Sequence, residues 1–172
     1  GHVRYSTTGS SMLANAQPFM IKHSGKCLAV AHNGNLVNAR AIRTQLENNG
    51  SIFQTTMDSE IVLHLVTKSL KKGMEQAVID TMKRIRGAYS MVIMTKDSLI
   101  AIRDPNGFRP LCLGKPDSGY VIASETCALD LVEACYVRDL EPGEVLIIDK
   151  NGVRSVYVEK ACRKAHCIFE LI

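Results

Sequence analysis

The spacing of apolar residues along the chain changes from a strand pattern to a helical pattern and then back to strands. Short apolar runs at residues 18–23 and 27–31 flank a Ser-Gly-Lys turn, which predicts a buried hairpin. The polar residues 32–35 interrupt this pattern, so the second strand is expected to end before them. From Leu36 to Leu46 apolar side chains recur at helical spacing, which predicts a helix ended by a following glycine.

Two more helices are expected in the middle of the chain. The first follows Asp58, Asp58 or Ser59 can cap its start, and its apolar stripe extends to Leu70. The second covers about residues 74–85 and stops at Gly87.

The second half of the chain has the short apolar runs and turn signals typical of strands. Lys96–Asp97 and Asn151–Gly152 form tight turns, and Asn-Gly readily adopts the positive φ angles of a hairpin. Strands thus lie at both ends of the chain and helices in the middle, without βαβ alternation, which predicts an α+β fold. The expected later elements are strands at residues 88–94, 98–103, 110–113, 120–123, 145–149 and 153–158, and a short helix at about 126–134.

Length and composition narrow the class of protein. The 172 residues, 46% apolar and 22% charged, fit a globular protein with one domain at residues 1–158, followed by a linker at 159–172 that enters a second domain. The net charge of +4 comes from scattered basic residues, so no nucleic-acid partner is expected. No apolar run of about 18 residues occurs, so no membrane partner is expected. The chain enters a strand-like run directly from Gly1, so we expect that its true beginning is missing.

Six cysteines are dispersed along the chain without a C-x-x-C pair. The first four are expected to be small buried hydrophobic residues with free thiols, in a reducing compartment. These four are Cys27, Cys112, Cys127 and Cys135. Near the end of the chain, Cys162, His166 and Cys167 are too few ligands for a zinc site.

Three polar segments have side chains suited to the parts of an amino acid. Arg4, followed by the Thr7 hydroxyl, offers a rigid fork of donors for a carboxylate. Asn33 and Gly34 precede a helix, where a side-chain amide and backbone N–H groups suit a developing oxyanion. Asp58 can hold an ammonium group. Taken one at a time, the same segments also fit a surface arginine, a simple turn and a helix cap.

A family resemblance connects these segments. Residues 1–9 (GHVRYSTTG), 31–38 (AHNGNLVN), 58–60 (DSE) and 103–111 (RDPNGFRPL) resemble the amidophosphoribosyltransferases, the glutamine–PRPP amidotransferases that open purine synthesis. The resemblance covers the whole chain and is to their glutamine amidotransferase domain, of the class with an N-terminal cysteine nucleophile. Tyr5 favours this family over the glucosamine-6-phosphate synthases, which typically have Trp after the arginine.

The resemblance implies a four-layer αββα sandwich of two antiparallel sheets between helices, of the N-terminal-nucleophile hydrolase type and here incomplete at the N-terminus. It implies that Arg4 and Thr7 bind the α-carboxylate of L-glutamine and that Asp58 binds its α-ammonium. The Asn33 side chain and the Gly34 N–H are expected to form the oxyanion hole. In the family, the terminal cysteine attacks the amide, and the released ammonia converts PRPP to 5-phosphoribosylamine.

The sequence departs from the family pattern in two ways. It contains neither the segment with the nucleophilic cysteine nor an Asp-Asp PRPP loop of the transferase domain, so the chain alone is expected to be inactive. Two alternatives stay open: a noncatalytic glutamine-binding module that lost its nucleophile, and another amidotransferase of this class, such as glucosamine-6-phosphate synthase.

Further expectations concern the full-length protein. The resemblance implies a homo-oligomer (dimer or tetramer) in the cytoplasm, with Mg²⁺ at the PRPP site. It also implies that Cys167 is one ligand of a [4Fe–4S] cluster. No cofactor is expected in the chain itself.

Overall fold

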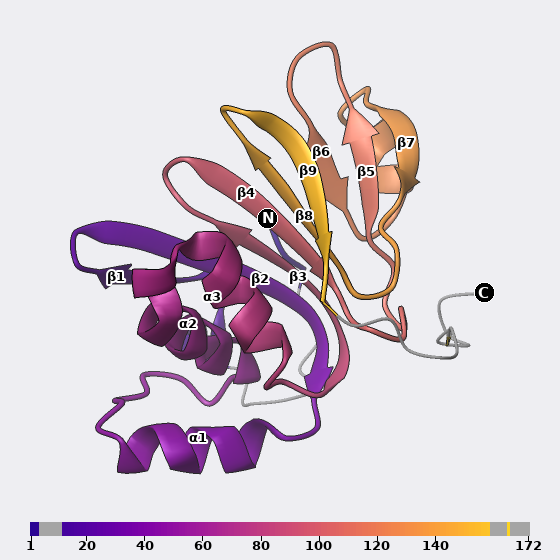
Figure 1. Ribbon diagram of the computed structural model, residues 1–172. Helices are drawn as coiled ribbons and strands as arrows, with labels where there is room; N and C mark the ends of the chain where they lie inside the picture. Colours follow the sequence, from indigo (N-terminus) through magenta and orange to yellow (C-terminus); the bar gives the residue numbers. More distant parts are fainter. Residues whose placement is uncertain (4–11, 159–164, 166–172) are drawn as a thin grey trace. The chain divides into compact units, whose positions relative to one another are not determined.

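The computed structural model describes residues 1–3, 12–158 and 165, and Figure 1 shows its helices and strands. Three of the predicted site residues, Arg4, Thr7 and Cys167, lie outside the described residues. The predicted domain division after residue 158 falls at the edge of the described residues and stays a prediction. The chain forms two compact units, one of residues 1–87 and 93–96 and the other of residues 88–92 and 97–172.

The first unit contains an antiparallel hairpin of β1 (Phe19–His23) and β2 (Lys26–Leu36). Phe19 lies opposite Val30 in its register. The turn residues Ser24 and Gly25 have φ angles of 49° and 76°, as a two-residue hairpin turn requires. The predicted hairpin is therefore present.

Strand β2 continues to Leu36, so the prediction that residues 32–35 end the strand is wrong. The reason is tertiary. The side chains of Gln17 and Asp58 bind the backbone of this polar stretch and hold it extended. Local polarity alone does not reveal such contacts.

Helix α2 (Asp58–Ser69) packs on this hairpin, and α1 (Ala39–Asn48) and α3 (Met74–Met82) pack on α2 (Figure 1). The helix α2 contacts β1, β2, α1 and α3, and it is buried on most sides. Because other elements enclose it, α2 carries apolar side chains around much of its circumference rather than on one narrow stripe. The other helical elements of the unit are the short 3₁₀ helices η1 (Leu13–Asn15) and η2 (Leu70–Lys72).

The second unit has two sets of antiparallel strands. Strand β8 pairs with β4 and β9, whereas β5 pairs with β6 and β7. Side chains of the two sets pack together around Ala101, Leu113 and Leu146. The strands are β4 (Ser98–Arg103), β5 (Cys112–Lys115), β6 (Val121–Ala123), β7 (Cys135–Asp139), β8 (Glu144–Asp149) and β9 (Gly152–Tyr157), and β3 (Gly87–Met94) has residues in both units.

The short helix α4 (Cys127–Asp130) packs on the other face of the β5–β6–β7 sheet. Leu129 lies so close to Gly114 that an added Cβ there would be 2.6 Å from its Cδ2. The helix is shorter than the expected span of 126–134, since Glu133 takes a positive φ of 53°. Such a backbone conformation cannot continue a right-handed helix.

The α+β fold with two antiparallel sheets and helices is confirmed. In the second unit, one of these sheets consists of β6, β5 and β7 in that order. Strand β7 was not expected from the sequence, because four of its five residues are exposed and its apolar pattern does not alternate. No helix among the described residues is long and apolar enough to cross a membrane.

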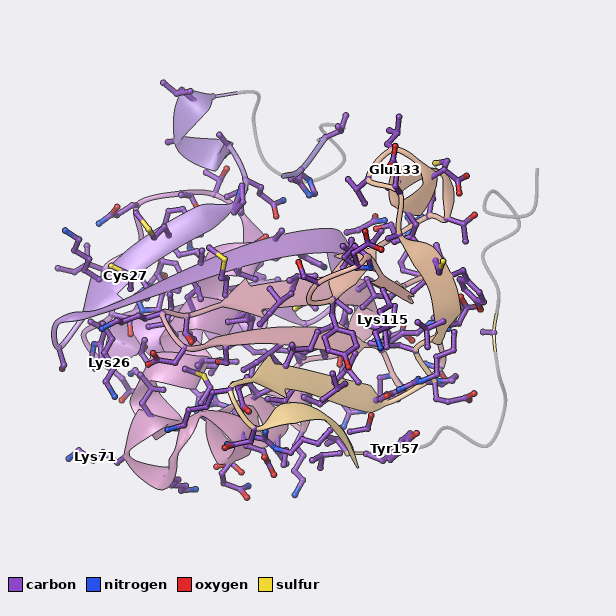
Figure 2. The ribbon with its side chains drawn as sticks, turned by 90° about the horizontal axis from the view of Figure 1, so that it is seen from above. Lys26, Cys27, Lys71, Lys115, Glu133 and Tyr157 are labelled. Atoms are coloured by element: carbon purple, nitrogen blue, oxygen red, sulfur yellow. The ribbon has the colours of Figure 1, made fainter. Side chains whose placement is uncertain are left out.

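The prediction of four buried cysteines is wrong for three of them. Cys112 is buried, but Cys27, Cys127 and Cys135 are exposed, and all four thiols are free. Cys27 follows Lys26 close to the hairpin turn (Figure 2), where strands are solvated. Cys127 begins the short helix α4, and Cys135 begins the edge strand β7. Apolar neighbours in the sequence therefore did not place these residues in the core.

Candidate functional site

Asp58 binds the polar stretch of β2 at two points. Its Oδ1 lies 3.2 Å from His32 Nδ1, and its Oδ2 accepts a 3.0 Å hydrogen bond from the Leu36 N–H. Asn33 and Gly34 lie between these two contacts along the strand. One carboxylate at the start of α2 thus fixes β2 on both sides of the predicted oxyanion residues.

The side chain of Gln17 holds the same stretch from the side of β1. Its Oε1 accepts a hydrogen bond from the His32 N–H at 2.7 Å, and its Nε2 donates to the His32 carbonyl at 3.4 Å. Since Phe19 lies opposite Val30, the register position opposite His32 is residue 17 itself. A side-chain amide therefore makes the pair of hydrogen bonds that a backbone would make in a regular ladder.

Two glycines shape the end of β2. Gly34 has a φ of 139°, a conformation that side chains disfavour. Gly87, with a φ of 151°, packs so closely that an added Cβ would lie 2.1 Å from the Asn35 carbonyl oxygen and 2.9 Å from Leu36 Cα. The segment at the start of β3 thus directly supports the Asn35–Leu36 peptide, whose N–H binds Asp58.

A buried glutamate holds the loop that leads into α2. Glu60 is 1% exposed, and its Oε1 accepts the Gln54 N–H at 2.8 Å. Its Oε2 accepts the Thr55 N–H at 2.8 Å and the Thr55 hydroxyl at 2.7 Å. Asn15 binds the next residue, Thr56, through both atoms of its amide, at 2.9 and 3.1 Å. Side-chain hydrogen bonds therefore hold residues 54–56, directly ahead of α2.

The surroundings of Asp58 favour its ionised form. Burial raises its pKa, but the His32 side chain and the N–H groups of Leu36 and Ser59 outweigh burial and hold the pKa of Asp58 below its ordinary value. Each carboxylate oxygen can accept more than one hydrogen bond. Asp58, which is 7% exposed, can therefore still bind a cation such as an ammonium group.

The segment at residues 103–111 forms a turn in the second unit whose charged side chains bind backbone groups. The fully buried Asp104 accepts hydrogen bonds, each 2.9 Å long, from the N–H groups of Asn106, Gly107 and Phe108. The Arg103 guanidinium donates to three carbonyl oxygens at 2.6 to 3.0 Å. These two residues therefore stabilise the turn.

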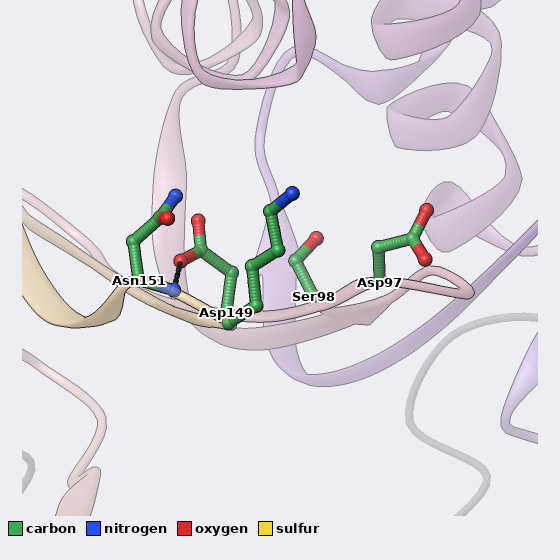
Figure 3. A pocket seen from close by; sticks show the side chains of 5 residues that line it. Asp97, Ser98, Asp149 and Asn151 are labelled. Carbon is green, nitrogen blue, oxygen red and sulfur yellow. Dashed lines mark hydrogen bonds between the residues drawn. The ribbon is translucent and has the colours of Figure 1, made fainter.

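A surface pocket of the second unit lies at the β8–β9 turn and the start of β4 (Figure 3). Its Asp149 accepts the Asn151 N–H at 2.7 Å and the Arg154 guanidinium at 2.6 Å, so its charge is already compensated. Its lining residues are Asp97, Ser98, Asp149, Lys150 and Asn151. In the described part of the chain, no group of three His, Cys, Asp or Glu side chains gathers to hold a metal ion.

The structure places two predicted site residues, Asn33 and Gly34, on β2 between His32 and Leu36, the two residues of that strand that bind Asp58. Their roles toward a ligand stay predictions, as do those of Arg4 and Thr7. The sequence analysis missed four residues that hold this site, Gln17, His32, Glu60 and Gly87.

Comparison with known proteins agrees with this fold. Residues 2–131 match the family described as glutamine amidotransferase domain. The chain belongs to this family of glutamine amidotransferase domains. Amidophosphoribosyltransferases are similar to this chain over its full length, so the predicted family is confirmed.

The chain is 53% identical to amidophosphoribosyltransferase 1, chloroplastic, of Arabidopsis thaliana, over 100% of this chain and 31% of that protein. It is 44% identical to the Bacillus subtilis amidophosphoribosyltransferase, over 100% of this chain and 36% of that protein. The solved structure of the allosteric regulatory enzyme of purine biosynthesis superimposes with a TM-score of 0.92 at 44% identity, covering 98% of this chain and 37% of that chain. The chain thus spans about a third of the length of these proteins.

Proposed function

We propose that this chain forms the glutamine-hydrolysing site of an amidophosphoribosyltransferase, which supplies ammonia for the first step of de novo purine synthesis. The observation that carries the proposal is the double contact of Asp58 with β2 around Asn33 and Gly34. The carboxylate of Asp58 binds His32 and Leu36, which lie on either side of Asn33 and Gly34 along the strand. The carboxylate suits the ammonium end of glutamine, and the Asn33 amide and the Gly34 N–H suit its reacting carbonyl.

In this proposal, Asp58 binds the α-ammonium of L-glutamine, and Arg4 with Thr7 binds its α-carboxylate. A cysteine thiolate of the whole protein attacks the side-chain amide carbon, after giving its proton to the terminal amino group. The Asn33 amide and the Gly34 N–H stabilise the oxyanion that forms. The C–N bond then breaks, the leaving nitrogen takes up the proton to depart as ammonia, and water hydrolyses the thioester to glutamate.

The ammonia then reacts with PRPP at the transferase site, displacing pyrophosphate and giving 5-phosphoribosylamine. The 172-residue chain alone, whose sequence shows no segment with the nucleophile, is expected to bind glutamine without releasing ammonia.

The substitution Asp58→Asn in the full-length protein tests this proposal. A hydrogen bond to a charged group contributes about 1.5–3 kcal/mol, so we expect the KM for glutamine to rise about 10- to 150-fold. Formation of phosphoribosylamine from added ammonium salt should not change, because that route bypasses the glutamine site.

Asp80→Asn is the matched control, since Asp80 binds Lys72 at the surface of α3 and should leave both activities as they are. A wild-type KM in Asp58→Asn contradicts the assigned role of Asp58. If the full-length protein binds glutamine but does not hydrolyse it, the proposed activity is wrong and the noncatalytic binding module is correct.

The remaining proposals concern the whole protein and rest on the resemblance. They are PRPP as second substrate, Mg²⁺ at its site, a homo-oligomer and a cytoplasmic location, although the plant relatives are named chloroplastic. A [4Fe–4S] cluster at Cys167 needs three more thiolates, and the described residues offer no gathered set of ligands. The iron and sulfide content of the full-length protein tests this proposal.

A further inference from the structure

The imidazole of His32 binds Asp58, but the proposed function assigns it no role. Its side chain is 1% exposed. Its Nδ1 lies 3.2 Å from Asp58 Oδ1 and 3.5 Å from Ser59 Oγ. Its Nε2 is buried and has no hydrogen-bond partner within the part of the chain that the structure describes.

The contact with Asp58 determines which ring nitrogen of His32 carries a proton. An ionised carboxylate accepts hydrogen bonds and cannot donate them, so Nδ1 has to be the donor. In a neutral ring Nε2 is then a bare acceptor, and burying it without a partner costs free energy. The ring is therefore oriented toward Asp58 although this orientation leaves its other nitrogen unsatisfied.

The backbone of His32 is fixed independently of its ring. Gln17 binds both its N–H, at 2.7 Å, and its carbonyl, at 3.4 Å. The ring therefore takes its position from β2 and connects that strand to a carboxylate on the first turn of α2. Asn33, the next residue along the strand, shares the same fixed backbone.

We propose that His32 is a positioning residue for glutamine binding, whose Nδ1–H holds the Asp58 carboxylate in place relative to Asn33 and Gly34. The inference rests on the proposed function, because it concerns the ammonium ligand of that site. Asp58 contacts β2 through His32 Nδ1 and the Leu36 N–H. Without the His32 bond only the Leu36 bond remains, and the carboxylate can rotate more freely. Since other groups act at the reacting carbonyl, the effect falls on the KM for glutamine rather than on kcat.

Three substitutions in the full-length protein separate this role from simple core packing. His32→Asn keeps an amide N–H near the position of Nδ1, His32→Gln moves the amide toward the position of Nε2, and His32→Leu removes both polar groups. We expect His32→Leu and His32→Gln to raise the KM for glutamine about tenfold or more, with kcat little changed. His32→Asn should stay within about threefold of the wild type.

Activity with added ammonium salt should be unchanged in all three variants, which shows that the transferase site is intact. A kcat with glutamine close to that of the wild type shows that the glutamine site itself has folded. A wild-type KM in His32→Leu, or a KM in His32→Asn as high as in His32→Leu, overturns the proposal. A fall in kcat at an unchanged KM does so too. Failure of the proposed function gives a different result, because the wild-type protein itself would then not hydrolyse glutamine.

A measurement that needs no activity gives a second test. In the histidine ¹⁵N spectrum of the wild-type protein, His32 should show a protonated Nδ1. A neutral ring with its proton on Nε2 overturns the proposal whatever the kinetics show.

Discussion

Replacing Gly87 with alanine pushes a methyl group against the backbone that carries one anchor of Asp58. The added Cβ would stand 2.1 Å from the Asn35 carbonyl oxygen and 2.9 Å from Leu36 Cα, and no rotamer change can move these backbone atoms. A carbon–oxygen contact needs roughly 3.3 Å, so the Asn35–Leu36 peptide has to move by about 1 Å. This displacement weakens the hydrogen bond from the Leu36 N–H to Asp58.

The expected loss of stability has two parts. Overpacking typically costs about 1–3 kcal/mol. A residue with a side chain at the φ of 151° adds about 1–3 kcal/mol. We therefore expect the free energy of unfolding to fall by about 2–6 kcal/mol, which for a chain of this size lowers the Tm by roughly 4–24 °C. Circular dichroism during heating and during urea titration measures both quantities.

Gly50→Ala is the matched control in the same unit. Gly50 also has a positive φ, 81°, but an added Cβ there meets nothing within 4 Å. This substitution is expected to cost about 1–2 kcal/mol, from the left-handed backbone alone. If Gly87→Ala destabilises the protein no more than Gly50→Ala, the reasoning about the backbone contact is refuted.

Two further predictions concern buried polar contacts. Burial raises the pKa of Glu144, but its hydrogen bonds with Arg138 and Ser155 outweigh burial and hold the pKa below its ordinary value of 4.5. The contribution of Glu144 to stability is therefore fully present above pH 4.5 and is lost as the pH falls through the lowered pKa. Arg138→Leu should therefore lower the free energy of unfolding by about 2 kcal/mol at pH 7 and by less below about pH 4, and equal losses in urea titrations at the two pH values would contradict this account. Gln17→Ala should cost about 1–2 kcal/mol and speed hydrogen exchange of the His32 amide, whereas Gln17→Glu, which keeps the acceptor for the 2.7 Å bond, should cost less. Exchange at the His32 amide that is unchanged in Gln17→Ala would show that the side-chain bond does not protect it.

Much of the fold could be predicted because its signals are local. The two hairpins at Ser24–Gly25 and at residues 150–152 follow from local turn residues, and Gly25 and Gly152 take the positive φ angles that glycine accepts. The position of α2 follows from polar residues ahead of an apolar helical stripe, but the predicted side-chain cap is wrong, because Met57 precedes the helix and makes no side-chain cap hydrogen bond. Strand β7 could not be found in this way, because an exposed edge strand lacks the alternation that burial imposes.

The candidate site could be predicted only in part. Asn33, Gly34 and Asp58 were selected because their residue types suit an oxyanion and an ammonium group, and these roles stay predictions. Gln17 and His32 act through contacts with residues distant in the sequence, and neither has a local signal of its own. The length of β2 was misjudged for the same reason, since its polar end depends on these contacts.

The Glu60 hydrogen bonds to Gln54 and Thr55 have a thermodynamic consequence for ligand binding. They order the loop ahead of Asp58 during folding, so its conformational entropy is lost before any ligand arrives. A ligand that reaches this preorganised carboxylate gives up its own freedom without having to order the loop as well. Affinity at this end of the site is then limited by the flexibility of the ligand rather than by that of the protein.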